Sequence, residues 1–207
     1  METKNIINIT INPNLNVSGS IRTLYNNYSA FQIRDELKRT NIDQFIEKEK
    51  AKISNKQPTN FMIKNIDNLD DTLELSYDFK DLKPIQNSDE IYLNAISFGE
   101  FKTNPFESNI RYSPISFGCP RKETILINYS IPEGYTIESI PKEVNIELPQ
   151  KAGLFAFTSK HNSQKVTISS FIDIYKSDFG VEEYTQLREF YNTIINYQAQ
   201  QIILKKL

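Results

Sequence analysis

Residues 104–149 carry the clearest structural signal in the chain: NPFESNIRYSPISFGCPRKETILINYSIPEGYTIESIPKEVNIELP. Within this stretch, Ile125, Ile127, Tyr129 and Ile131 occupy every second position. Successive side chains of a β-strand point to opposite faces, so these four side chains lie on one face of an extended chain. The spacing predicts a half-buried strand over residues 121–131.

A turn and two further short strands are expected after this strand, at Pro132–Gly134, Tyr135–Ile140 and Val144–Leu148. Proline fixes φ and glycine tolerates φ > 0, which is the combination that a tight turn uses. Prolines also separate the strands, and a proline cannot donate a hydrogen bond inside a central ladder. We therefore expect these prolines at strand ends or on edge strands.

The residues before this stretch predict strands around a helical pair. Alternating isoleucines up to Ile11 and the turn signal Asn12–Asn14 predict an opening hairpin with residues 15–25. A helical period begins near Ser29, and Thr40 and Asp43 form a candidate capping box for a second helix, which places Phe45, Ile46 and Ile53 inward. Three further strands are predicted at Thr59–Asn65, Leu73–Phe79 and Glu90–Asn94.

The residues after this stretch predict a hairpin and a helix. Residues 153–160 and 165–175 form the expected hairpin, with Val166, Ile168, Ile172 and Ile174 on one face of its second arm. From Val181 the apolar period becomes helical. The inward positions of this last helix are Tyr184, Leu187, Tyr191, Ile194, Ile195 and Gln198.

These elements predict an α+β fold that is mainly antiparallel β. We expect sandwich-like sheets, a helical pair near residues 29–54 and a C-terminal helix. The 207 residues are interpreted as a single β-rich module. Two subdomains remain an alternative: residues 1–100 with the hairpin and helical pair, and residues 101–207 with most strands and the last helix.

Composition excludes several classes of protein. A formal net charge of −2 and the lack of Lys/Arg runs argue against a nucleic-acid surface. One cysteine excludes an internal disulfide framework. No apolar run has the length of a transmembrane helix, and no charged and apolar leader follows Met1, so we expect a soluble chain without an export signal.

A thiol-dependent mechanism would need the single cysteine, Cys119, and the single histidine, His161, with an acid such as Asp173. Cys119 lies in a turn before a strand. It lacks the neighbouring helix N-terminus that favours the reactive thiolate form of a cysteine. His161 is expected in a hairpin loop. We interpret both as structural residues and predict neither catalytic nor cofactor-binding residues.

Three other patterns have a functional and a simpler interpretation. The oxygen-rich loop with Asp67, Asn68, Asp70 and Asp71 lacks the glycine and the closing glutamate of a calcium-binding EF-hand, so we interpret it as a polar turn and predict no metal site. Asn104–Phe106 matches a short peptide ligand of adaptor domains, but it lies within a folded run. The many Tyr and Phe residues could form a sugar-binding face, although stripes at strand spacing are more typical of a core.

Short motifs in a fixed order carry a family resemblance. The motifs are Tyr28–Ala30 with Arg34, Leu75–Phe79, Ile91–Leu93, Asn104–Phe106, Arg111–Ile115, Ile131–Tyr135, Glu138–Pro141 and Ile202–Lys206. Through them the chain resembles the C-terminal, functionally uncharacterised domain of large transglutaminase-like proteins from the envelope of Gram-negative bacteria.

The resemblance implies that this β-rich domain follows an N-terminal β-sandwich and a papain-like domain with a Cys, His and Asp triad. The chain contains none of the motifs of that catalytic domain. We therefore expect a non-catalytic accessory or interaction module, whose partner is a preceding transglutaminase-like domain or another protein, in the periplasm or cell envelope. The alternative is a stand-alone module that binds a carbohydrate or a peptide.

Overall fold

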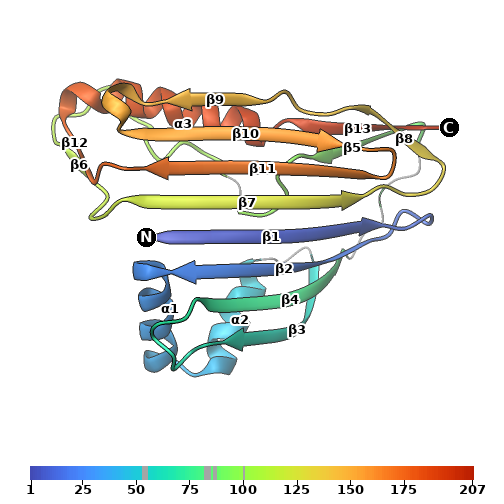
Figure 1. Cartoon of the computed structure of the whole chain (residues 1–207), viewed down its shortest axis with the longest axis horizontal. Coiled ribbons are helices and arrows are strands. Elements are labelled where there is room, and N and C mark those ends of the chain that lie inside the picture. The colour runs from blue at the N-terminus through green and yellow to red at the C-terminus, as the bar shows by residue number, and fades with distance from the viewer. Residues whose placement is uncertain (53–55, 82–84, 86–87, 100) are drawn as a thin grey trace.

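The computed structural model describes residues 1–52, 56–81, 85, 88–99 and 101–207. Most of its strands belong to one mixed sheet of eight strands in the order β3-β4-β2-β1-β7-β11-β10-β9 (Figure 1). These strands are β1 Glu2–Ile11, β2 Val17–Asn26, β3 Lys56–Lys64, β4 Leu73–Asp81, β7 Arg121–Ser130, β9 Val144–Glu147, β10 Gly153–His161 and β11 Lys165–Ile174.

Two smaller antiparallel sheets and three α-helices complete the part of the fold that these residues form. One small sheet has the order β5-β13-β8, and the other pairs β12 with β6. Their strands are β5 Glu90–Asn94, β6 Ile115–Ser116, β8 Tyr135–Ser139, β12 Asp178–Phe179 and β13 Gln201–Lys206. The helices are α1 Asn27–Arg39, α2 Ile42–Lys52 and α3 Tyr184–Gln198, with single 3₁₀ turns at Pro149–Lys151 and Val181–Glu183.

The prediction of an α+β fold, mainly β, with a C-terminal helix is confirmed. The strand prediction for residues 121–131 is also confirmed, because Ile125, Ile127 and Tyr129 are buried in β7. Gly134 has a φ of +85°, as the predicted turn requires. The strands after β7 are edge strands of different sheets, β8 of the small sheet and β9 of the large one.

The core lies on one face of the large sheet. Alternate residues of β1, β7, β11 and β10 are buried, and α3 and the β5-β13-β8 sheet pack on them through residues such as Leu187, Ile194, Ile202 and Leu204. A second cluster, around Phe45, packs α1 and α2 against β3 and β4. Its β4 member, Leu75, lies on the same face as Ile21 and Thr23 of β2. All three helices therefore cover the same face, which we call the core face.

The last helix carries a polar residue, Gln198, on its buried side, because neighbouring groups in the core form hydrogen bonds with its side chain. Gln198 is 1% exposed. Its Nε2 donates to Ser170 Oγ at 3.0 Å, and its Oε1 accepts the backbone N–H of Phe101 at 2.9 Å. The inward position predicted for Gln198 is thus confirmed.

The helical pair differs from expectation in its details. The predicted capping box at Thr40 is wrong: Asn41 Oδ1 accepts the backbone N–H of Gln44 at 2.8 Å, while the Thr40 hydroxyl donates back to the Glu36 carbonyl at 2.9 Å. Phe45 is buried as predicted, and Ile53 lies outside the described residues.

Two pairings were not predicted. β1 pairs with β7 in parallel, so strands from residues 1–100 and from residues 101–207 share one sheet. The C-terminal residues form β13, which is the central strand of the small sheet. Within the described part of the chain, no helix combines the length and the apolar character needed to cross a membrane.

Candidate functional site

The structure separates the candidate nucleophile from the candidate base. Cys119 is half-buried just before β7, whose first residue, Arg121, pairs with Ile174. His161 ends β10 and pairs with Val166, at the opposite end of β11. A strand rises about 3.3 Å per residue, so the two side chains lie roughly 25 Å apart. They cannot share a hydrogen bond, and the thiol mechanism built on them fails.

The oxygen-rich loop after β3 holds an arginine. The Arg34 side chain of α1 is 6% exposed and points its guanidinium at the loop's carbonyl oxygens. Its Nη2 donates to Asn65, Asn68 and Asp71 at 2.9, 2.5 and 2.8 Å, and its Nε donates to Ile66 at 3.1 Å. This side chain supplies the cation that the carbonyl groups surround. Among the described residues, no group of His, Cys, Asp and Glu side chains could hold a metal ion.

The Asn104–Phe106 tripeptide is part of the folded core. Asn104 Nδ2 donates to the Arg188 carbonyl at 2.9 Å and to Asn192 Oδ1 at 2.7 Å, both on α3. Phe106 is 7% exposed, and its ring makes an edge contact with the Tyr191 ring at 5.1 Å between centroids. The tripeptide therefore fixes the 101–117 segment to α3 and is not available as a peptide ligand.

The exposed aromatic side chains do not form a row on a strand face in the described part of the chain. Tyr28 and Phe31 stack on α1 at 5.6 Å, and Tyr92 lies on β5. Tyr112 and Tyr175 belong to connecting segments. A flat platform for stacked sugar rings is therefore not among the described strands, and the sugar-binding face is not favoured by this arrangement.

The face of the large sheet opposite the core face carries none of the helices and neither small sheet; we call it the open face. Its centre is an apolar strip across adjacent strands, made of half-buried side chains of Leu24, Ile6, Leu126 and Phe171. Lys4 and Lys122 lie beside the strip, and the Lys122 ammonium is 5.5 Å from the centre of the Phe171 ring.

A polar ladder borders this strip on the open face. Asn128 Nδ2 donates to Asn8 Oδ1 at 3.0 Å, and Thr167 Oγ1 donates to Asn128 Oδ1 at 3.0 Å. Asn8 Nδ2 also donates to Ser20 Oγ at 3.5 Å, so the ladder runs across β2, β1, β7 and β11. An apolar strip with a polar border is typical of a surface that another protein covers.

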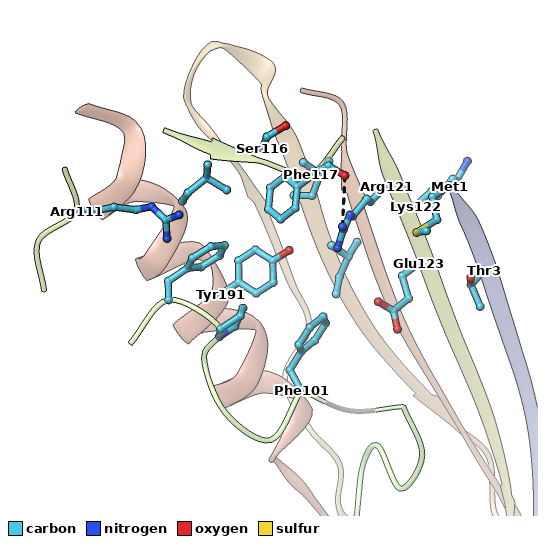
Figure 2. A pocket seen from close by; sticks show the side chains of 15 residues that line it. Met1, Thr3, Phe101, Arg111, Ser116, Phe117, Arg121, Lys122, Glu123 and Tyr191 are labelled. Carbon is cyan, nitrogen blue, oxygen red and sulfur yellow. Dashed lines mark hydrogen bonds between the residues drawn. The ribbon is translucent and has the colours of Figure 1, made fainter. Parts of the chain in front are cut away.

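A cavity of about 540 Å³ opens on the other side of β7, between the sheet and α3 (Figure 2). Tyr191 and Arg111 reach it from the side of α3 and the 101–117 segment, and Arg121 and Glu123 reach it from β7. Phe101, Phe106 and Phe117 supply aromatic walls. We call this space the α3–β7 cavity.

The α3–β7 cavity places charged groups against apolar walls. Burial raises the pKa of the Glu123 carboxyl from 4.5 to about 7, although the nearby Arg121 guanidinium acts in the opposite direction. Burial also raises the pKa of Tyr191 to about 12. The Arg121 guanidinium lies 4.8 Å from the centre of the Phe117 ring and donates to the Phe117 carbonyl at 3.4 Å.

Sequence reasoning assigned no function to these cavity residues. Glu123 falls at an inward position of the predicted strand, in phase with Ile125 and Ile127. An ionisable residue in phase with core residues is the signal that could have identified the site. Nothing in the sequence, however, shows that Tyr191 of α3 faces Glu123.

The comparisons with known proteins give one match. No curated protein and no solved structure matches the chain. The model of a family described as a domain of unknown function with a solved structure, DUF3858, matches residues 89–204. This region runs from the start of β5 into β13 and is more than half of the chain. It includes the lining residues of the α3–β7 cavity except Met1 and Thr3. The chain therefore belongs to the DUF3858 family.

Proposed function

We propose that this chain is a non-catalytic accessory module of a transglutaminase-like protein of the bacterial cell envelope, and that its open face contacts the catalytic domain. The observation that carries the proposal is the apolar strip of Leu24, Ile6, Leu126 and Phe171 on a sheet face that no other part of the described chain covers. The family resemblance in the sequence supplies the partner.

The chemistry of the open face fits a protein partner. The strip spans adjacent strands of a continuous sheet, so it offers a flat apolar area without a deep pocket. Charges of both signs lie around it: Lys4, Lys122 and Arg22 are interspersed with Glu2, Glu74 and Asp173, and Arg22 is paired with Glu74 at 2.8 Å. This favours a partner surface with an apolar centre and a rim of mixed charge. The strands that carry the strip, β2, β1, β7 and β11, pair with one another along most of their length, so the surface is formed before binding.

The test is a calorimetric titration of this chain into the separately purified transglutaminase-like domain from the same source. We expect binding by the natural chain, and a loss of at least tenfold in affinity for a variant with Ile6→Lys and Leu126→Lys, because two charges would be buried in an apolar interface. Thr10→Lys is the matched control, since it adds a charge to the open face beyond the strip. Circular dichroism checks that each variant is folded.

Two results would overturn the proposal. The first is that the natural chain does not bind the catalytic domain even at the high effective concentration that a linker between two domains of one protein provides. The second is that the double variant binds as tightly as the Thr10→Lys variant, which would place the contact elsewhere.

A further inference from the structure

We propose that the α3–β7 cavity binds a small carboxylate that carries an apolar group. This site is distinct from the apolar strip, because Glu123 and Arg121 occupy core-face positions of β7, whereas Leu126 belongs to the open face. The inference is therefore independent of the proposed docking role. Lys122, which lies beside the strip, also lines the cavity. The volume of about 540 Å³ suits a ligand of small-molecule size.

The aromatic walls supply the apolar part of the site. Phe106 and Tyr191 are buried and fixed by edge contacts with each other, and Phe106 makes a further edge contact with Phe117 at 6.3 Å between centroids. Phe101 also packs edge-on against Tyr191, at 5.5 Å. These walls are held in place without a ligand, so binding an apolar group costs little side-chain entropy.

The polar groups of the cavity have unused hydrogen-bonding capacity. Tyr191 is 4% exposed as a residue, but no fully buried polar side-chain atom of the described residues lacks a partner, so its hydroxyl reaches the open space of the cavity. Arg111 uses its Nε on the Ser113 carbonyl, and Arg121 uses one nitrogen on the Phe117 carbonyl. Neither guanidinium forms an ion pair with a carboxylate of the described residues. These polar groups reach the space of the cavity with hydrogen-bonding positions that a polar ligand can occupy.

The balance of charges favours an anion. Two guanidinium groups reach the cavity, and the Glu123 carboxyl is the one acidic group among the lining residues that the structure describes. At neutral pH and below, the raised pKa of Glu123 keeps much of this carboxyl protonated, so it can donate a hydrogen bond. A planar carboxylate matches a guanidinium fork, and the Tyr191 hydroxyl can donate to it as well.

The probe series keeps one apolar group and changes only its charge. It consists of 3-phenylpropionate, the neutral 3-phenylpropanamide and the cationic 3-phenylpropylamine, each titrated into the full chain at pH 6.5 and followed by NMR shifts. We expect the carboxylate to bind at least tenfold more tightly than the amide, and the amine to bind most weakly. Equal binding of all three, or tighter binding of the amine, would overturn the proposal.

Substitutions locate the site. Arg121→Gln and Tyr191→Phe are expected to weaken the carboxylate severalfold or more, while Arg39→Gln, a change at an exposed arginine of α1, leaves its affinity unchanged. An Arg121→Gln variant that binds as the Arg39→Gln variant does would contradict the assignment. The probe series with the natural chain tests the proposal even if a variant fails to fold.

A carboxylate with an apolar group could be a free acid or the C-terminus of a peptide. A tripeptide ending in phenylalanine, tested with a free and with an amidated C-terminus, distinguishes these sources. Binding of the free peptide but not of the amide identifies a peptide C-terminus as a ligand. Binding of 3-phenylpropionate without binding of either peptide identifies a free acid. Both results support the proposed chemistry.

Discussion

Glu123 illustrates how one residue links the stability of the fold to the proposed ligand site. Its carboxyl lies on the core face of β7, and its environment includes the guanidinium of Arg121 and the phenol of Tyr191. Burial raises the pKa of this carboxyl from 4.5 to about 7, so the folded chain binds more protons than the unfolded chain between these pH values. Stability contributed by the protonated group is therefore lost as the pH rises through this window.

The first prediction concerns the pH dependence of unfolding. Glu123→Gln replaces the carboxyl with a neutral group of the same shape. The free energy of unfolding of this variant should exceed that of the natural chain at pH 8, by up to about 3 kcal/mol, and the two should be nearly equal at pH 5. Urea unfolding at both pH values measures the difference.

An exposed glutamate in the turn after β7 provides the control for this measurement. Glu133→Gln removes a carboxyl at the surface and should change stability by less than about 0.5 kcal/mol at either pH. The account of Glu123 is contradicted if Glu123→Gln shows the same difference from the natural chain at pH 5 and at pH 8.

Arg34 shows why an acidic loop is not by itself a metal site. Four hydrogen bonds from one buried guanidinium satisfy carbonyl groups of the loop after β3, so the side chains of that loop are not needed to surround a cation. The sequence indicates a polar turn there. It cannot show that an arginine of α1 enters the turn, because the two segments are distant along the chain.

At the scale of elements, β13 joins two parts of the chain. It pairs with β5 on one side and with β8 on the other, and both Ile202 and Leu204 are completely buried.

We predict that Leu204→Ala lowers the free energy of unfolding by about 2–5 kcal/mol, because it leaves a cavity in the core. Leu207→Ala is the control, since that side chain is 87% exposed. Chemical denaturation measures both, and equal effects would contradict the packing role of β13.

Alternation in the sequence predicts most strands, because each of them buries one face. This holds for β1 with Ile7 and Ile9, for β4 with Leu73 and Leu75, and for β11. β13 was missed although Ile202 and Leu204 alternate, since it is short and follows a helix directly. The parallel pairing of β1 with β7 was missed for another reason: alternation shows that a strand has a buried face and says nothing about its neighbour.

The candidate site could be predicted only in part. The strand period places Glu123 inward and the helical period places Tyr191 inward, so the sequence indicates an ionisable side chain at each of these inward positions. Their meeting depends on how α3 packs across the sheet, and Asn104 and Phe106 fix that packing through side-chain contacts with the helix. These contacts are tertiary, and no single segment contains the information for them.

At the scale of the whole molecule, the large sheet separates two surfaces. The core face carries the helices and the small β5-β13-β8 sheet (Figure 1). The α3–β7 cavity lies on that side, while the open face carries the apolar strip and the polar ladder. Apart from Lys122, which lies beside the strip and also lines the cavity, the named residues of the two proposed sites lie on opposite faces of the sheet. The two proposals are therefore tested by different variants.

The proposed role depends most directly on whether the module belongs to a larger protein. The decisive measurement is the size of the native protein in its source cells, by immunoblot with an antibody against this chain, followed by peptide mass spectrometry of the band. We predict a band several times larger than 24.1 kDa, with peptides from a transglutaminase-like domain that contains a Cys, His and Asp triad. A single band at the mass of this chain, without such peptides, would contradict the assignment as an accessory module of a transglutaminase-like protein.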